Sequence, residues 1–215
     1  MKKFLIALSM LAFSVFCRAE SDRERVDFDY IGSFYLGTPV MVGDFPALEM
    51  SRSASFFYDL CHVKVGLDSD CHINIRAAVR YCYNNIAFRK AITFVEEEGL
   101  IYPEPLTVTG LKKSKLNLSY ISLPLGIDLR FGKFELGLNY SADFLIRAKS
   151  KYKFSDGKIK TDLYDGLNSF VNTAEIVCSY DGIGFVVNYG MTPIIESGSW
   201  YDDARVVSFG VVLGF

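Results

Sequence analysis

The chain has 215 residues, of which 50% are hydrophobic, 15% aromatic and 22% charged, and its formal net charge is −2. A chain this apolar is neither intrinsically disordered nor a low-complexity polymer, because it has too much apolar surface to leave in water. The charge argues against a general nucleic-acid binder, which needs a basic excess to replace counterions on phosphate. The surface of the 18 Phe, 13 Tyr and one Trp must therefore be largely removed from contact with water.

The first residues have the pattern of an export signal. Two lysines are followed by an uncharged, mostly apolar run over residues 4–16 and by Ala19. A basic start, an apolar stretch of about 7–15 residues and a small residue at the cleavage point are typical of a secretory signal peptide, and the run is too short to span a bilayer as a helix. We expect residues 1–19 to be cleaved, which leaves residues 20–215 as one domain.

Export also determines how the cysteines are interpreted, since disulfides form outside the cytoplasm. Cys61, Cys71, Cys82 and Cys178 remain after cleavage, and their spacing does not match that of zinc ligands. We expect small apolar side chains on strands, with a bridge between Cys61 and either Cys71 or Cys82 as the alternative. Acylation of Cys17 in a lipoprotein is the alternative to a plain signal peptide.

From Val26 onward, large apolar residues alternate with small or polar ones, which is typical of strands with one apolar face. In the last segment, Phe209 and Val211 alternate with Ser208 and Gly210. The pattern predicts eight strands. The connections between them cover residues 38–53, 67–71, 87–115, 132–133, 149–168, 181–182 and 194–203.

Short and long connections alternate along the chain, as they do in outer-membrane barrels with tight periplasmic turns and long external loops. The two shortest connections, 132–133 and 181–182, each contain the glycine that a two-residue hairpin favours. Pro124 cannot donate to a strand ladder, and the apolar phase slips over residues 118–121. We therefore expect a bulge or a break in pairing in this strand.

The sequence predicts an all-β fold: an eight-stranded antiparallel up-and-down transmembrane β-barrel of the outer-membrane type. A soluble barrel would place its apolar face inside. An eight-stranded barrel, however, is only just wide enough for side chains, so the small, polar set fits inside and the bulky apolar set faces outward against lipid. Strands of about 9–11 residues suffice to cross a bilayer when tilted.

Several charged residues fall on the interior face, where opposite charges pair and plug a narrow barrel rather than line a conduit. This expected interior network consists of Arg76, Arg80, Asp128, Arg130, Glu135, Asp143, Arg147 and Glu175.

Two further features are typical of insertion into a membrane. The segment that ends at Phe215 is similar to the C-terminal signal that the barrel-assembly machinery reads, with Ser208, Gly210, Leu213 and Phe215 at the specified positions. Aromatic residues near the predicted strand ends suit two girdles that anchor a barrel at the bilayer surfaces. The upper girdle comprises Tyr83, Phe144, Phe170, Trp200 and Tyr201, and the lower girdle Phe28, Phe131, Phe134, Tyr180 and Phe185.

Four segments carry a resemblance to a known family: Tyr120–Leu125, Gly132–Phe134, Leu136–Leu138 and Asn188–Pro193. Together they resemble the PorT-like outer-membrane β-barrel proteins of Bacteroidetes-type bacteria, from about residue 72 to the end of the sequence. The resemblance implies an outer-membrane barrel, but no substrate and no catalytic residue.

The sequence offers little for catalysis. Ser/His/acid chemistry needs a histidine within hydrogen-bond reach of a serine and of a third group, and nothing brings His62 or His72 to such a trio. Both are expected to be polar residues near a periplasmic turn. The acidic run 96–98 is expected to be solvated, mobile surface, and the aspartates of other loops lack EF-hand spacing. We expect no catalytic residue, cofactor or metal.

The expected role is that of a non-enzymatic protein of the bacterial outer membrane, in a Gram-negative envelope, active in binding, adhesion or envelope structure. Its expected partners are outer-membrane lipid, the barrel-assembly machinery during insertion, and an external protein or glycan, but not nucleic acid. The first alternative is transport of a small solute or a part in a secretion apparatus, as the PorT-like resemblance allows. The second is a lipid-modifying barrel enzyme.

Overall fold

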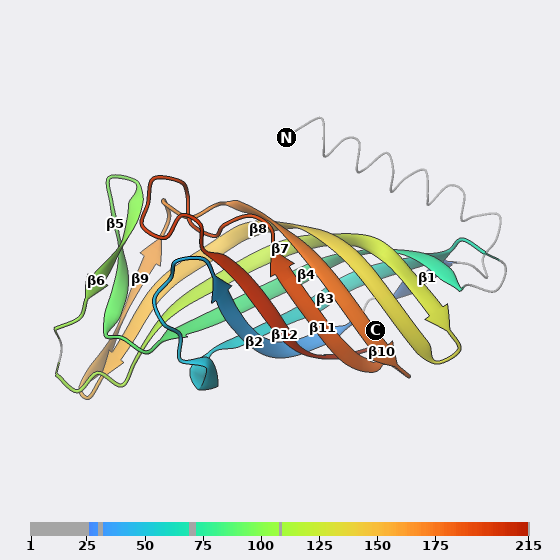
Figure 1. Cartoon of the computed structure of the whole chain (residues 1–215), viewed down its shortest axis with the longest axis horizontal. Helices are drawn as coiled ribbons and strands as arrows, with labels where there is room; N and C mark the ends of the chain where they lie inside the picture. Colours follow the sequence, from blue (N-terminus) through green and yellow to red (C-terminus); the bar gives the residue numbers. More distant parts are fainter. Residues whose placement is uncertain (1–25, 30–31, 69–71, 108, 215) are drawn as a thin grey trace.

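The computed structural model describes residues 26–29, 32–68, 72–107 and 109–214. Eight strands, each antiparallel to its neighbours, close into a barrel because the last strand pairs with the first (Figure 1). These strands are β2 (Phe34–Val42), β3 (Ala54–Gly66), β4 (Ile73–Phe88), β7 (Lys113–Phe131), β8 (Phe134–Phe154), β10 (Phe170–Tyr180), β11 (Ile183–Gly190) and β12 (Arg205–Leu213). The predicted eight-stranded antiparallel barrel is confirmed.

The two ends of the barrel differ. Phe34 at the start of β2 pairs with Leu213 at the end of β12, and Leu213 pairs with Ile183, next to the two-residue turn 181–182. We call this the turn end. We call the opposite end the loop end, because four long connections lie there. They cover residues 43–53, 89–112, 155–169 and 191–204.

The longest strands continue beyond the barrel wall. The predicted connections 87–115 and 149–168 were wrong in this respect, because β4, β7 and β8 extend into them and further strands form there. β5 (Ile92–Glu97) and β6 (Leu100–Pro105) make a hairpin, and β9 (Gly157–Leu163) pairs with the far part of β8. Lysines on one face of these extensions interrupt the apolar alternation on which the sequence prediction depended.

The first predicted strand, 26–37, is instead divided. β1 (Val26–Asp29) pairs with the turn-end part of β3, whereas β2 pairs with the loop-end part of the same strand edge. A short 3-10 helix, η2 (Met50–Arg52), precedes β3. Within the described ranges, no helix is both long enough and apolar enough to cross a membrane.

Two bulges adjust the wall. The register between β7 and β8 passes from Ser119–Arg147 to Tyr120–Leu145, so Ile146 is an extra residue. This confirms the bulge expected over residues 118–121, although the extra residue lies on the partner strand. A second bulge in β3 leaves Leu60 as the extra residue.

Pairing also breaks where the proline predicted it. Between β4 and β7 the register stops at Ala77–Leu125 and resumes at Arg80–Ser122, on either side of Pro124. Proline lacks the N–H that the ladder needs at this position.

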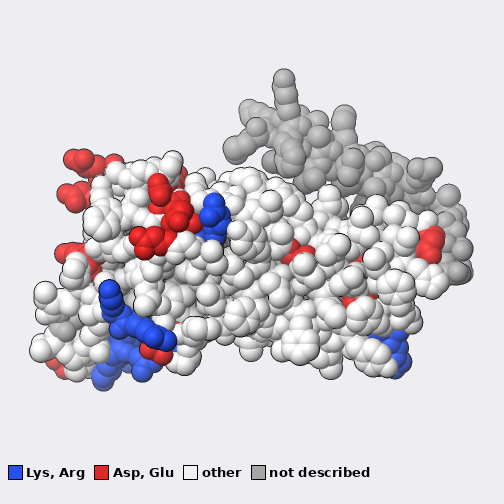
Figure 2. All heavy atoms as spheres, viewed as in Figure 1, with Lys and Arg blue, Asp and Glu red and all other residues white. Residues whose placement is uncertain are grey.

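The two faces of the wall are opposite in character. Interior positions hold small or polar residues such as Ser122, Gly126 and Ser208, whereas outward positions hold exposed apolar side chains. These exposed residues include Leu125, Ile127, Leu138, Ile176, Ile183, Phe185, Val187, Phe209 and Val211. The visible side of the barrel between its ends carries few charged side chains (Figure 2).

Candidate functional site

The middle of the barrel is filled by a balanced group of four buried charges. Arg80 donates to Asp59 Oδ1 (2.5 Å) and to Glu175 Oε2 (2.7 Å), and Arg76 donates to Asp59 Oδ2 (2.7 Å). The Arg80 guanidinium carbon lies 3.6 Å from the ring centroid of Phe57. Two cations and two anions thus neutralise one another inside a barrel that these side chains fill, which leaves little room for a conduit.

A second ionic group lies nearer the turn end. Lys64 Nζ is 3.5 Å from Asp128 Oδ2 and 3.3 Å from Glu135 Oε2, and Asp128 is fully buried. Together with the central four charges, this group fills the interior over much of its length.

The eight residues expected in the interior network do not all meet there. Arg76, Arg80 and Glu175 form the central group, and Asp128 and Glu135 form the second. Asp143 lies separately, on the loop-end side of the central group. Its carboxylate accepts hydrogen bonds from two hydroxyls, those of Ser141 (2.6 Å) and Thr173 (2.5 Å).

One of the eight, Arg147, is on the outside, and Arg130 lies at the rim of the turn end. The side chain of Arg130 is 57% exposed; its Nε lies 3.9 Å from Glu135 Oε1 of the second group and donates to Gly132 O. The side chain of Arg147 is 63% exposed and lies 3.9 Å from Asp162. Arg147 points outward because the extra residue Ile146 shifts the alternation of β8 by one position.

Sequence reasoning missed Asp59 and Lys64. Asp59 is fully buried and bonds both central arginines, so it is the common partner of the network. The bulge at Leu60 breaks the period of two in β3 just after Asp59, which hides its inward direction in the sequence. The signal that could have found Asp59 is its pairing across the β3–β4 hairpin, because Asp59 lies directly opposite Arg80, which the sequence already placed in the interior.

A cavity of about 70 Å³ lies between the central charges and the loop end. Arg80, Cys82, Asp143, Thr173 and Glu175 contribute to its lining. It is large enough for a few water molecules, which need polar partners such as these. The Ser122 hydroxyl donates to Cys82 Sγ at 3.2 Å.

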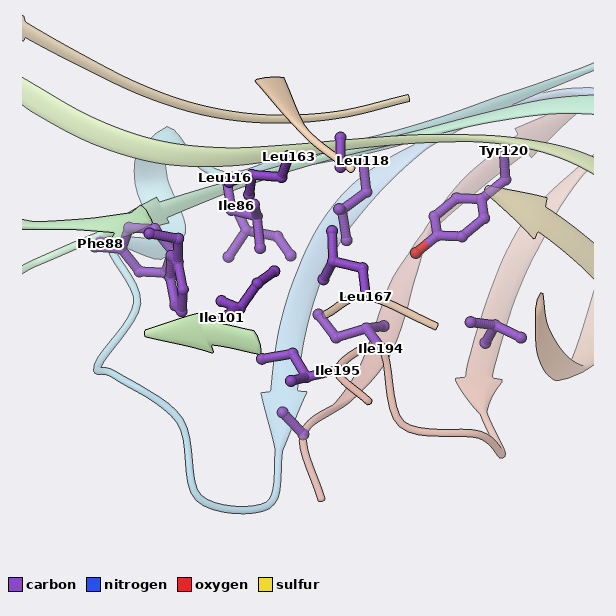
Figure 3. Close-up of a cluster of buried hydrophobic side chains, with 14 of the residues drawn as sticks. Ile86, Phe88, Ile101, Leu116, Leu118, Tyr120, Leu163, Leu167, Ile194 and Ile195 are labelled. Atoms are coloured by element: carbon purple, nitrogen blue, oxygen red, sulfur yellow. The ribbon is translucent and has the colours of Figure 1, made fainter. Parts of the chain in front are cut away.

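A hydrophobic cluster, which we call the cap, fills the loop end (Figure 3). Side chains from the strand ends and from all four long connections point toward one another in it, and Phe94 stacks on Phe45 with ring centroids 5.8 Å apart. Its residues include Ile86, Phe88, Ile92, Phe94, Ile101, Leu116, Leu118, Leu163, Leu167, Ile194 and Ile195, with Phe45, Leu48 and Tyr201 packed against them. The connections therefore form one packed layer.

Hydrogen bonds join the connections to one another. Asn168 donates to the carbonyls of Pro193 (2.8 Å) and Ile195 (3.0 Å), and Ile101 N donates to Ser199 Oγ (3.2 Å). The third and fourth connections, and the β5–β6 hairpin, are tied together in this way.

The acidic run 96–98 differs from the expected solvated, mobile surface in one member. Glu96 Oε2 accepts the backbone N–H groups of Tyr164 (2.8 Å) and Asp165 (3.1 Å). These two donors stabilise the carboxylate and lower the pKa of Glu96. Glu96 thereby ties the β5–β6 hairpin to the connection after β9.

The histidines occupy different environments. His72 Nδ1 lies 3.2 Å from Asp68 Oδ2 in an exposed turn, as expected of a polar turn residue. His62, in contrast, lies within β3, which continues past it to Gly66, and its side chain is buried. Among the described residues, no cluster of three or more His, Cys, Asp or Glu side chains could hold a metal ion.

Cys61, Cys82 and Cys178 are free thiols. Alternation places Cys61 outward and Cys82 inward, so the alternative bridge between these two is wrong. Cys71 lies outside the described residues, as do Cys17 and the expected signal peptide 1–19.

The expected membrane-insertion signal divides between the two faces. Ser208 is buried in the interior and lies 3.4 Å from the Asn188 amide, Gly210 is inward beside β2, and Leu213 is exposed on the outside. Phe215 lies outside the described residues.

Most of the expected aromatic girdles lie at the two rims of the barrel. Phe131, Phe134, Tyr180 and Phe185 are exposed near the turn end, and Phe144 and Phe170 form a ring pair 5.2 Å apart toward the loop end. Trp200 is exposed in the last long connection. Tyr201 departs from the expectation, because its ring packs edge-on against Phe45 in the cap.

A scan against protein-family models, a search of curated proteins and a search of solved structures each found no match to this chain.

Proposed function

We propose that this chain is an outer-membrane β-barrel protein of the PorT-like kind, with its loop end facing the cell exterior and a non-enzymatic role in binding, adhesion or envelope structure. The observation that carries the proposal is the set of exposed apolar side chains on the outside of the barrel, among them Leu125, Leu138 and Ile176, which we call the belt. β10 runs for 11 residues, from Phe170 to Tyr180, and pairs along this whole length with Phe134–Phe144 of β8. That length matches a tilted strand crossing a bilayer, and aromatic residues lie at both of its ends.

Water is a poor solvent for this belt. A soluble protein rarely exposes a contiguous apolar surface of this extent, and lipid would cover it without leaving a backbone group unsatisfied, because the barrel is closed. The predicted cleavage of residues 1–19 and the predicted insertion signal ending at Phe215 agree with this route, through the barrel-assembly machinery to outer-membrane lipid.

The filled interior favours a binding or structural role over conduction. The central charges around Arg80 occupy the lumen, and the cap covers one mouth of it. An ion pathway would have to break both. The folded cap instead offers a fixed external surface, with Tyr164 and Trp200 exposed on it, to a protein or glycan partner.

Fractionation of cells that express the full chain tests the proposal. We expect the protein in the outer-membrane fraction, with faster gel migration before boiling than after it, as a closed barrel resists detergent. Replacing Phe215 by Ala should reduce assembly, and Phe209→Leu, which keeps an apolar residue, should not. Recovery of a soluble periplasmic monomer without detergent would overturn the proposal.

The PorT-like resemblance favours one alternative, transport of a small solute or a part in a secretion apparatus. Planar-bilayer recordings separate the two roles: we expect no stable conductance, and steady channels would support transport. A lipid-modifying enzyme is the weaker alternative. It predicts an altered lipid profile when His62 and His72 are replaced by Ala.

A further inference from the structure

The strand extensions beyond the apolar belt carry a strongly basic face. On β7, β8 and β9, buried residues such as Ser114, Leu116 and Ser150 point into the cap, and the alternate residues point outward. Among the outward residues of this sheet, eight cations lie next to one another, together with the neutral Asn117 and a single acid, Asp162. The cations are Lys113, Lys115, Arg147, Lys149, Lys151, Lys153, Lys158 and Lys160.

The register places lysine directly opposite lysine. Lys151 of β8 lies between Lys115 of β7 and Lys160 of β9, and Lys153 lies between Lys113 and Lys158. Like charges directly opposite each other destabilise a sheet, and neighbouring strands are only about 4.8 Å apart. Two rows of three ammonium groups thus cross the sheet.

The only acid of the face already pairs with cations outside the two rows. Asp162 lies 2.8 Å from Lys149 and 3.9 Å from Arg147. Among the described residues, no carboxylate forms an ion pair with the six lysines of the two rows. Lys115 Nζ instead donates to the carbonyl of Arg52, which brings one more basic residue to the edge.

The repulsion within these rows also contributes to a lowered pKa of one of their lysines. Lys151 lies beyond the belt, and its partial burial, followed by the charges of Lys160 and Lys113, lowers its pKa. An anion placed over the rows would remove this repulsion.

The position of the face indicates which anion is available. The belt ends at the pair Ile121–Phe144, and the basic face begins at the next outward pair, Ser119–Arg147. Both lie on the same outward side of the wall, so the face looks sideways, toward the lipid, at the height where headgroups begin. Lys and Arg side chains gather at this end of the molecule (Figure 2).

We propose that this basic face binds the phosphate groups of glycolipid headgroups in the outer leaflet. This inference rests on the proposed membrane location. Each phosphate would lie between ammonium groups of neighbouring strands, which exchange mutual repulsion for charge-assisted hydrogen bonds. The face is the sideways contact of the protein with its membrane, distinct from the upper surface of the cap.

The test uses the full chain refolded into phosphatidylcholine vesicles that contain a minor fraction of diphosphorylated lipid A. The protein is extracted in mild detergent, and the lipid A that stays bound is measured by mass spectrometry. The variant with Lys113, Lys151, Lys153 and Lys160 all replaced by Gln should retain at least about tenfold less lipid A than the wild type. Lys133→Gln at the turn end is the matched control and should change nothing.

Three further arms keep the outcomes distinct. The double variant Lys158→Gln/Lys160→Gln changes only two exposed residues of an edge strand; it should retain an intermediate amount, and it decides the question if the fourfold variant does not fold. Dephosphorylated lipid A should not be retained. Retention equal to that of wild type in the variants, retention of dephosphorylated lipid A, or binding of soluble heparin in place of lipid A overturns the inference.

Flotation separates this inference from the proposed function. If the wild-type protein does not float with the vesicles, the membrane location itself fails. If it floats but retains no lipid A, only the headgroup site fails.

Discussion

Arg80 of β4 lies directly opposite Asp59 of β3, and its Nε donates to Asp59 Oδ1 at 2.5 Å in the closed interior of the barrel. Because Arg80 also binds Glu175, one guanidinium joins two carboxylates that come from strands on different parts of the wall. The barrel is therefore cross-linked through its centre as well as around its circumference.

Replacing Arg80 by Met should destabilise the protein by about 3–5 kcal/mol, because it leaves buried carboxylates without their cation. Urea unfolding of the barrel in vesicles measures this. The control is Lys133→Met, which breaks the exposed 2.8 Å pair with Asp181 and should cost less than about 1 kcal/mol. Equal decreases in the free energy of unfolding of the two variants would show that the central ion pairs stabilise the barrel no more than an exposed pair does.

The cap should open separately from the barrel. Phe94 is 1% exposed and packs on Phe45 and Phe88, so Phe94→Ala should cost about 3–5 kcal/mol, mostly in the cap. We expect new protease cleavage within residues 89–112 while the unboiled protein still migrates as a folded barrel. Trp200→Ala, at an exposed position, should leave the digestion pattern unchanged. An unaltered pattern for Phe94→Ala contradicts a packed cap.

The link made by Glu96 should depend on pH. Its pKa is lowered in the folded protein, so the stabilisation is fully present above the ordinary glutamate pKa of about 4.3 and is lost as the pH falls through the lower folded value. The protection of the Tyr164 and Asp165 amides from hydrogen exchange, measured relative to the intrinsic exchange rate at each pH, should therefore fall in that acidic window. Glu96→Gln should give fast exchange already at neutral pH, whereas Glu97→Gln should not. Protection that is independent of pH in the wild type rules the link out.

Gly210 should not tolerate a side chain. A Cβ at this inward position would overlap the Leu36 carbonyl oxygen and the Cα of Gly37 on β2, where the barrel closes. Gly210→Ala should cost about 1–3 kcal/mol through overpacking, measured by urea unfolding. Ser208→Ala adds no atoms in the same strand and serves as the control. This separates a packing role of Gly210 from its predicted role in the insertion signal.

A charge in the outward belt tests the lipid contact directly. Leu138→Arg should destabilise the vesicle-inserted barrel by about 2–4 kcal/mol, because the new cation must leave water. Ile159→Arg, half-exposed on β9 beyond the belt, should change stability by less than about 1 kcal/mol. If both variants behave alike in vesicles, the belt does not face hydrocarbon.

The sequence was informative wherever alternation was uninterrupted. The segments 121–131, 134–144 and 170–180 show it plainly, and their facing, turns and pairing follow from the period of two. Even the irregularity in β7 was detectable, because Pro124 and the slipping apolar phase both mark it.

What escaped prediction follows from single extra residues and from distant contacts. Leu60 and Ile146 each shift the alternation by one, which concealed Asp59 and misassigned Arg147. The cap has no period to detect: Ile101 and Leu167 meet only because strands far apart in sequence bring their connections to one mouth.

The cap has a consequence for how the protein is seen from outside. Its four connections share one core, and hydrogen bonds through Asn168 and Ser199 join three of them, so none of them keeps its shape alone. An antibody or ligand at this surface would recognise residues from several connections at once, and synthetic peptides copied from a single connection would not reproduce its epitope. Sequence drift in one connection is likewise constrained by the other three.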